Sequence, residues 1–495
     1  MGDQLHFVQL EMMVAALGLC VLLGDLFLPM TARRALGWIA AGALGLVFLL
    51  SFRESYTGLA NGEAFGGIFR LDELALFFKR FFLLAGIFVL VFAVDFAERL
   101  RGGVSEYLAF ILFALSGMMF AASANDFSLL FVSIELITVT FYILVSFQRH
   151  RMQSLEAGVK YLILGAVSSA FLVYGIALVF GEVGSLKFDD LRDAHAELLE
   201  SNVFLFGMLF VFAGLAFKIS AFPFQVWAPD VYQGAPTPTT TFLAVGSKAA
   251  GFVLLIRLFG SVVPELTAQW TGLLIAVAAL TILYGNLCAL PQRNLKRLLA
   301  YSGIANAGYL LMGIVAQSGE GTAAILYYLA GYLFTLVAAF MIIHLVTREG
   351  EGEDIARIAG LSQRSPCLAF ALVLCAVSLA GIPPLAGFFG KFLLVKSVAA
   401  EAFGNAGYFA LLAVAVFGVV VSIYYYFGII RAMYWPGETP DESPVAVAWP
   451  TRVALGLCVA AILYLGLLPD KPMNWANTAA NIEKRSSAEA ADPRR

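Results

Sequence analysis

The sequence predicts an all-α polytopic membrane protein with about 14 transmembrane helices. The 495-residue chain is 61% hydrophobic and only 13% charged, and its mean hydropathy is +0.86. Soluble domains carry about one-quarter charged residues, so this composition excludes a soluble globule. The apolar runs are continuous over about 20 residues, which is the length of a membrane-spanning helix. A membrane β-barrel would instead show alternating strands of about 10 residues.

Fourteen apolar runs are long enough to be membrane spans. They lie near residues 8–28, 35–52, 76–96, 104–122, 127–147, 157–180, 202–222, 238–260, 268–290, 298–316, 321–346, 367–400, 405–434 and 449–468. The connections between most of them are short, so each span should run antiparallel to the one before it.

The basic residues of the loops predict the orientation of the chain. The odd-numbered loops hold most of them, and Arg149 and Arg297 are examples, whereas the even-numbered loops hold mainly Arg53, Arg70, Lys187 and Arg192. Because lysine and arginine stay in the cytoplasm, both termini are expected on the periplasmic side. The basic residues of the tail, which include Lys484 and Arg495, argue weakly against this orientation.

Two of the spans are interrupted by proline. The first break lies in KISAFPFQVWAPDVYQGAPTP near residues 218–238, and the second in SLAGIPPLAGFFGK near 378–391. Proline removes a backbone donor and clashes with the preceding turn, and the freed carbonyl groups need water or polar partners within a bilayer. The breaks therefore predict polar cavities.

The two breaks also suggest an internal repeat. Placing Pro223 on Pro383, an offset of 160 residues, aligns Ser-Ala-Phe-Pro with Ala-Gly-Ile-Pro. Broken helices in corresponding places are typical of repeats in transporters, and a separation of five spans inverts the second copy. We therefore expect a three-helix segment at 1–100, inverted five-helix repeats at 101–263 and 264–435, and a helix with a polar tail at 436–495. Two unrelated proline kinks are the alternative.

Four charged residues lie inside the predicted spans and mark a candidate site. Glu135 in FVSIELITVTFY and Lys248 in FLAVGSKAAGFVLL fall near the centres of their spans, Lys218 precedes the first break, and Lys391 follows the second. Each such charge costs roughly 2.5 to 3.5 kcal/mol unless it is paired or hydrated. A lysine near a carboxylate binds its proton with an affinity that depends on that carboxylate, so these residues suit proton transfer. The alternative is a set of structural ion pairs that fix helix packing.

Other polar residues lie near the span ends. Arg257, Asp25 and Asp95 are expected to reach the interface with their side chains. His344 is also near a span end, and because the reference pKa of histidine is about 6.5 it is a candidate proton relay. A histidine satisfied at the interface is the commoner case.

The sequence shows no motif for a cofactor. The five cysteines are scattered singly, with no CxxC spacing, and there is no GxGxxG after a strand, no P-loop and no HExxH. The net charge of −3 provides no basic patch for nucleic acid. We therefore expect no cofactor in this chain and no nucleic-acid partner.

The stretches KISAFPFQVWAPDVYQGAPTPTTTFLAVGSKAAGF and NLKRLLAYSGIANAGY resemble the antiporter-like membrane subunits of respiratory complex I, most closely the N-type subunit of NADH:quinone oxidoreductase. The resemblance covers nearly the whole chain. It implies an ion pair between Glu135 and Lys218, a link between two half-channels at Lys248, and an exit path at Lys391. The M-type sibling usually has glutamate at the last position, and the L-type has a long lateral helix.

The resemblance implies a proton-translocating subunit in the membrane arm, driven by quinone reduction elsewhere in the complex. NADH, FMN, iron-sulfur clusters and quinone are then expected in partner subunits, sibling antiporter-like subunits as neighbours, and the bacterial inner membrane as the location. Two other functions stay open. The chain could belong to a multi-subunit Na⁺/H⁺ antiporter, or it could be a non-conducting membrane scaffold.

Overall fold

Long apolar helices make up most of the structure. The computed structural model describes residues 2–27, 33–53, 62–100, 102–347, 352–402, 405–435 and 444–480. Within these residues twelve helices are long and apolar enough to cross a membrane. They are α3 (Arg33–Leu50), α5 (Glu73–Phe96, extended by η2 to Arg99), α6 (Val104–Ala122), α7 (Phe127–Val145), α8 (Met152–Val183), α10 (Asn202–Ile219), a composite span at Thr237–Gly260, α15 (Thr271–Ala289), α16 (Leu295–Val315), α17 (Gly319–Val346), α21 (Ala406–Tyr434) and α22 (Trp449–Leu467).

The remaining predicted spans are shorter helices. Helix α2 (Gln9–Asp25) has 17 residues, and α19 (Pro366–Ala380) and α20 (Ala386–Ala400) have 15 each and together form one interrupted span. With these two spans the described residues contain all fourteen that the sequence predicts. The basic tail at 481–495 lies outside the described residues, whereas the first part of the predicted polar tail, residues 470–480, is described and forms a short helix.

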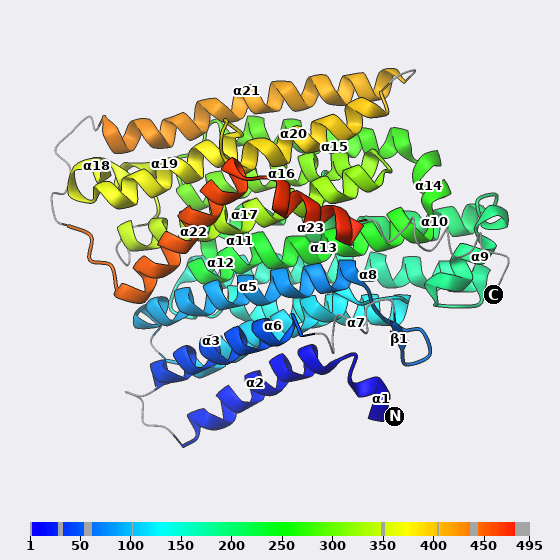
Figure 1. Cartoon of the computed structure of the whole chain (residues 1–495), viewed down its shortest axis with the longest axis horizontal. Coiled ribbons are helices and arrows are strands. Elements are labelled where there is room, and N and C mark those ends of the chain that lie inside the picture. The colour runs from blue at the N-terminus through cyan, green and yellow to red at the C-terminus, as the bar shows by residue number, and fades with distance from the viewer. Residues whose placement is uncertain are drawn as a thin grey trace.

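Short elements connect the spans. They are α1 (Gly2–Leu5), β1 (Gly62–Ala64), β2 (Phe69–Leu71), α9 (Phe188–Leu198), α11 (Trp227–Gly234), α14 (Pro264–Gln269), η5 (Ile355–Ile358), α18 (Leu361–Arg364) and α23 (Asp470–Ala480). The two strands form an antiparallel hairpin that pairs Glu63 with Arg70. Figure 1 shows the long helices running in roughly the same direction, with this hairpin at one end of the bundle and α18 at the other.

The interior of the bundle is formed by α16 and the composite span, which are buried along their whole hydrophobic length. The composite span consists of α12 (Thr237–Phe242), the π-helical segment η3 (Leu243–Ser247), α13 (Lys248–Leu255) and a second π-helical segment η4 (Ile256–Val262). Helices α3, α8 and α21 lie at the periphery, where fewer than a third of the residues in their apolar stretches are buried. The polar residues of α16 and of the composite span are therefore shielded from lipid.

Both predicted breaks are present, and they have the same backbone geometry. Helix α10 ends before Ser220, whose φ is 62°, and α19 ends before Gly381, whose φ is 84°. The amide of the next residue then bonds five residues back, from Ala221 to Ala216 and from Ile382 to Val377. These pairs lie 161 residues apart. The predicted offset of 160 is therefore wrong by one residue, because the Pro-Pro doublet of the second break lets a short sequence match slip.

Helix α11 after the first break is fixed by one carboxylate. Asp230 accepts a hydrogen bond from Lys160 of α8 at 2.7 Å and another from Arg297 of α16. An eight-residue helix is too short to be stable alone, so these contacts and its packing hold α11 in place.

Candidate functional site

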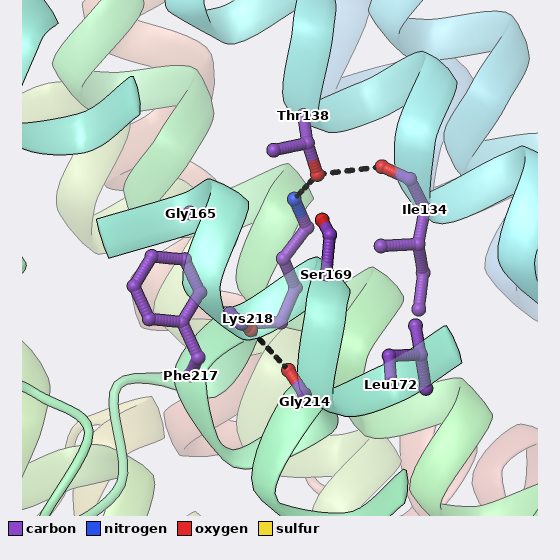
Figure 2. Close-up of a pocket in the computed structure, with 9 residues that line it drawn as sticks. Ile134, Thr138, Gly165, Ser169, Leu172, Gly214, Phe217 and Lys218 are labelled. Carbon is purple, nitrogen blue, oxygen red and sulfur yellow. Dashed lines mark hydrogen bonds between the residues drawn. The ribbon is translucent and has the colours of Figure 1, made fainter. Parts of the chain in front are cut away.

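Lys218 lies at the first break, at the end of α10, and its side chain is buried. Its Nζ donates a hydrogen bond to Thr138 Oγ1 of α7, and Thr138 in turn donates to the carbonyl oxygen of Ile134 at 2.6 Å. Figure 2 shows this chain of polar groups beside Ser169. These residues line a cavity of about 10 Å³, which is about the space that one water molecule needs.

Glu135 lies on α7, one turn before Thr138, and is half-buried. Its Oε1 accepts a hydrogen bond from Ser169 of α8, which lines the same cavity as Lys218. In the described part of the chain no ion pair within 4.0 Å joins Glu135 to Lys218. The two residues are instead connected through Ser169, the cavity and Thr138, so the ion pair that the resemblance implies is not formed as a direct contact in this structure.

Lys248 begins α13, directly after the π-helical segment η3, and is buried. Its Nζ donates to the carbonyl oxygen of Gly303 in α16 at 2.6 Å, and it lies 6.0 Å from the ring centroid of Tyr332. A Cβ at Gly303 would stand 3.2 Å from this nitrogen, so the absence of a side chain at Gly303 leaves room for the ammonium. The neighbouring hydroxyl of Ser247 is buried with no hydrogen-bond partner among the described residues. Such an orphan group is a site for water.

Lys391 lies in α20, after the second break, and is buried. Its Nζ donates to the carbonyl oxygens of Leu379 at 2.7 Å and of Ala380 at 3.4 Å, the last two residues of α19. These carbonyls form the negative end of the helix dipole, which favours a cation. The ring of Tyr309, with its centroid 4.8 Å away, provides a further cation–π contact.

His344 is buried near the end of α17 and packs against the rings of Phe92 and Phe96. Its Nε2 lies 3.7 Å from Asp95 Oδ2, and its backbone oxygen accepts a hydrogen bond from Arg99 at 2.8 Å. The structure therefore places His344 beside a carboxylate, that of Asp95.

The expectation for Arg257 is wrong. Its guanidinium does not extend to the interface but bonds both oxygens of Asp72, at 2.9 and 2.7 Å, and both residues are buried. A bidentate pair satisfies both charges and compensates their removal from water. Asp25 is half-buried at the end of α2, as expected for a span end, and bonds Arg33 at 2.9 Å and Ser105 at 2.6 Å.

Two buried charge pairs were missed by the sequence analysis. Glu11 of α2 and Lys79 of α5 approach to 2.7 Å with no side-chain exposure. Lys296 of α16 is also unexposed and lies 3.6 Å from Glu353. Glu11 and Lys79 fall inside predicted spans, so a search for every charge within a span would have found them. Lys296 was counted as a loop residue, and its burial comes from tertiary packing that the sequence does not reveal.

A search of the described residues finds no group of three or more His, Cys, Asp and Glu side chains that could hold a metal ion. The site instead consists of single charged groups, each held by a hydroxyl or a backbone carbonyl. Such an arrangement can hold and pass protons between neighbouring groups and water.

Comparisons with known proteins identify the family of this chain. Residues 124–422 match the family model described as NADH:quinone oxidoreductase/Mrp antiporter, TM. The NADH-quinone oxidoreductase subunit N of Moorella thermoacetica is 40% identical over 478 residues, covering 96% of this chain and 98% of the relative. That of Desulforamulus reducens is 38% identical over 471 residues, covering 95% and 97%.

Solved structures show the same fold. A chain of respiratory complex I from Thermus thermophilus is 30% identical with a TM-score of 0.76, covering 94% of this chain and 98% of its own length. A chain of the Mrp complex from Dietzia sp. DQ12-45-1b has a TM-score of 0.83 over 98% and 99%, but at 19% identity it supports the fold alone. The chain therefore belongs to the NADH:quinone oxidoreductase/Mrp antiporter transmembrane family, and within that family to the NADH-quinone oxidoreductase N subunits.

Proposed function

We propose that this chain is a proton-translocating subunit in the membrane arm of an NADH:quinone oxidoreductase. The observation that supports this most is the placement of Lys218, Lys248 and Lys391, which are buried inside apolar helices and each bonded to an uncharged oxygen. A buried ammonium without an ion-pair partner is costly. Release and uptake of a proton during turnover would explain why these lysines are buried despite that cost.

The three lysines have distinct roles in this proposal. Lys218 exchanges its proton through the small cavity that it shares with Ser169, and Glu135 tunes the affinity of that lysine from the other side. Lys248 links the half-channels at residues 101–263 and 264–435. Lys391 passes the proton on near the carbonyl end of α19. His344 is a lesser candidate, because the charged group beside it is Asp95 and not one of these lysines.

Other subunits supply the energy. NADH, FMN, iron-sulfur clusters and quinone would be bound by partner subunits, and sibling antiporter-like subunits would flank this chain in the bacterial inner membrane. The loop arginines favour periplasmic termini. Cysteine-accessibility labelling tests this orientation: a cysteine at Ser185 should react only from the periplasm, and one at Gln292 only from the cytoplasm.

The relatives favour this function over a sodium/proton antiporter. The curated relatives at 37 to 40% identity are named as NADH-quinone oxidoreductase N subunits, whereas the Mrp neighbour is 19% identical. Purifying the assembly through a tag on this chain distinguishes the two. Co-purifying NADH dehydrogenase activity, with proton pumping that needs no sodium, is expected, and sodium-dependent proton exchange without NADH oxidation would contradict the proposal.

A scaffold role is tested by Lys218→Met. Methionine keeps the length of the side chain and removes the charge, so packing is retained. In inverted membrane vesicles we expect a normal amount of assembled complex but reduced NADH-driven acidification. A fully assembled complex that pumps at the normal rate would favour the scaffold.

A further inference from the structure

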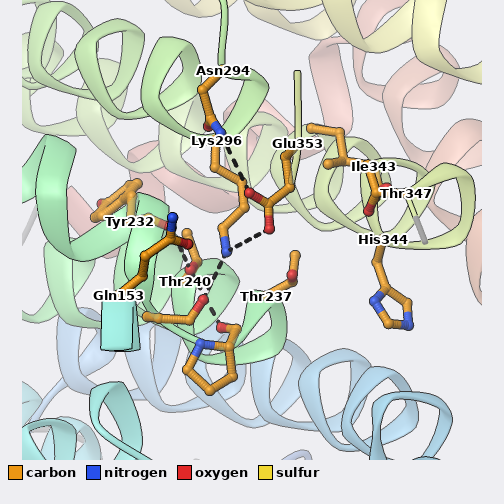
Figure 3. A network of polar contacts seen from close by, with 12 residues as sticks. Gln153, Tyr232, Thr237, Thr240, Asn294, Lys296, Ile343, His344, Thr347 and Glu353 are labelled. Atoms are coloured by element: carbon orange, nitrogen blue, oxygen red, sulfur yellow. Dashed lines mark hydrogen bonds and ion pairs between the residues drawn. The ribbon is translucent and has the colours of Figure 1, made fainter. Parts of the chain in front are cut away.

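The ion pair of Lys296 and Glu353 lies at the end of the bundle that the loop arginines predict to face the cytoplasm. Lys296 stands in the first turn of α16 with no exposed side-chain surface. Its Nζ donates to the carbonyl oxygen of Ala235, at the end of α11, at 2.7 Å and lies 3.6 Å from Glu353 Oε1. Figure 3 shows the lysine extending from Asn294 and Glu353 toward Tyr232 and Thr240.

Glu353 is the member of this pair that reaches the surface. Its side chain is 10% exposed, against 0% for Lys296. Burial raises the pKa of Glu353, but the Lys296 ammonium and the Arg151 guanidinium together outweigh this effect. The pKa of Glu353 therefore lies below its ordinary value. Glu353 therefore stands as a carboxylate between water and a buried lysine.

The segment that carries Glu353 is attached without this charge pair. The amide of Leu295 donates to the Glu353 carbonyl oxygen at 2.7 Å, and the amide of Ile355 donates to that of Arg293 at 2.8 Å. Because backbone bonds already fix the segment, the ion pair is not needed to hold it. A buried ion pair also adds little stability compared with apolar side chains of the same size. These two facts point to a role other than attachment.

Lys296 and Gly303, the residue to which Lys248 bonds, lie on the same face of α16. Lys248 bonds to Gly303, seven residues after Lys296, and seven residues are about two turns or roughly 10 Å along a helix. Buried polar groups lie close to Lys296 on the inner side, among them Thr237, Thr240 and Tyr232. The inner side of Lys296 therefore faces buried polar groups of α11 and α12, and the proposed link at Lys248 lies about two turns further along α16.

We propose that Glu353 and Lys296 form an intake site that takes protons from the cytoplasm and passes them toward Lys248. The inference rests on the proposed function of the chain. In one cycle the Lys296 ammonium releases a proton inward and becomes a neutral amine. Glu353 then takes a proton from cytoplasmic water and gives it to that amine, which restores the ammonium and the carboxylate. One proton enters for each proton released.

The charges around the pair set its pH response. The positive charges of Arg151 and Arg99 interact electrostatically with Lys296, and that of Arg151 also with Glu353. The charge of Lys296 in turn interacts with His344. The arginines stay charged at all working pH values, so Glu353, Lys296 and His344 are the members of this group that can titrate.

The test uses variants that separate proton transfer from attachment. The double variant Lys296→Met/Glu353→Gln removes both charges and leaves no buried charge unpaired. Lys296→Arg keeps the ion pair but cannot release its proton, because arginine stays protonated. Glu353→Asp keeps a carboxylate. The matched control is Lys396→Met/Glu320→Gln, which neutralises an exposed pair at 3.2 Å. Assembly, NADH-driven acidification and turnover are measured in inverted membrane vesicles between pH 6 and 9.

We expect the double variant and Lys296→Arg to assemble while acidification and coupled turnover fall about tenfold or more, since a positioned proton-transfer group contributes at least this much. The control should stay close to the unmodified protein, and Glu353→Asp should retain more activity than Glu353→Gln because it keeps a carboxylate. In Glu353→Gln the alkaline limit of activity should move to lower pH, because the lysine must then be protonated by water directly. An attachment role would not move this limit.

Normal pumping by assembled Lys296→Arg would overturn the intake site, and so would normal pumping by the double variant. If the double variant does not assemble, Lys296→Arg decides alone, because it retains the charge that packing needs. The Lys218→Met variant separates this failure from that of the proposed function. If Lys218→Met is impaired while Lys296→Arg is normal, the intake site alone is wrong, and if both pump normally, the chain does not translocate protons.

Discussion

Lys391 lies after the second break, yet it donates its hydrogen bond back across the break to the carbonyl oxygen of Leu379, at 2.7 Å. The side chain thus joins the two halves of an interrupted span. It also supplies the positive charge that the carbonyl end of α19 favours. This contact explains how a charged residue is retained at a helix break within a membrane.

Replacing Lys391 with methionine should reduce NADH-driven acidification and coupled turnover while the complex still assembles, because the carbonyls at the break can bind water instead. The control is Lys396→Met on the same helix, where the lysine is exposed and pairs with Glu320. Equal activity in the two variants would show that Lys391 is only a packing residue.

Gly381 should not tolerate a side chain. Its φ of 84° costs an L-residue about 1 to 2 kcal/mol, and a Cβ there would stand 2.9 Å from Cδ of Lys391. We expect Gly381→Ala to lower the melting temperature of the purified complex and its turnover together. The counterpart Ser220→Gly, at the other left-handed position, should leave both close to normal, and a harmless Gly381→Ala would contradict this account.

The hydroxyl of Thr138 should be required by Lys218. Thr138→Val keeps the shape of the side chain but removes the oxygen to which the ammonium donates. An unpaired buried donor costs about 1 to 3 kcal/mol, or more when charged, so we expect slower turnover. Thr140→Val is the control, because this hydroxyl bonds only to the Leu136 carbonyl of its own helix among the described contacts. A stopped-flow measurement of proton uptake should show a defect in the first variant alone.

The pair of Glu11 and Lys79 should contribute to stability through its balance of charge. Lys79→Met leaves a carboxylate buried and unpaired, which costs about 3 to 5 kcal/mol. We expect a clearly lower melting temperature for this variant. The double variant Lys79→Met/Glu11→Gln should recover most of the loss, and no recovery would mean that the lysine contributes mainly through packing, for instance against the Phe69 ring.

Acid should weaken the bond between Asp72 and Arg257 only at low pH. Burial raises the pKa of Asp72, but the Arg257 guanidinium outweighs this effect. The pKa of Asp72 in the folded state therefore lies below its ordinary value. The stability from this pair is then complete above the ordinary pKa of about 3.9 and is lost as the pH falls through the lowered value. Hydrogen exchange at Ala75, whose amide bonds to Asp72, should therefore show undiminished protection from pH 8 to 5. In Asp72→Asn this protection should be lower throughout that range.

The sequence predicted the spans well because membrane helices follow simple physics. Every backbone group must be satisfied within the span, so length and hydropathy determine where a helix such as α7 lies. The breaks were visible because proline interrupts a helix locally. The offset between the two breaks was wrong by one residue. It is set by the left-handed conformations of Ser220 and Gly381, and the short sequence match does not reveal these conformations.

The charged residues of the candidate site could be named from the sequence, but their contacts could not. A charge inside an apolar run is visible in the sequence, so Glu135, Lys218, Lys248 and Lys391 could be named. Which oxygen each one meets depends on how distant helices pack. For the same reason Lys296, at a helix start, could not be recognised as buried.

The register of 161 residues has a consequence for the direction of transport. The position equivalent to Lys218 is Leu379, and the position equivalent to Lys391 is Asp230. The lysines of the two halves therefore stand on opposite sides of their breaks, one before and one after. A protein made of two identical inverted halves would look alike from both faces of the membrane and would have no preferred direction. The unequal placement of these charges makes the two faces chemically different, which the proposed one-way movement of protons requires.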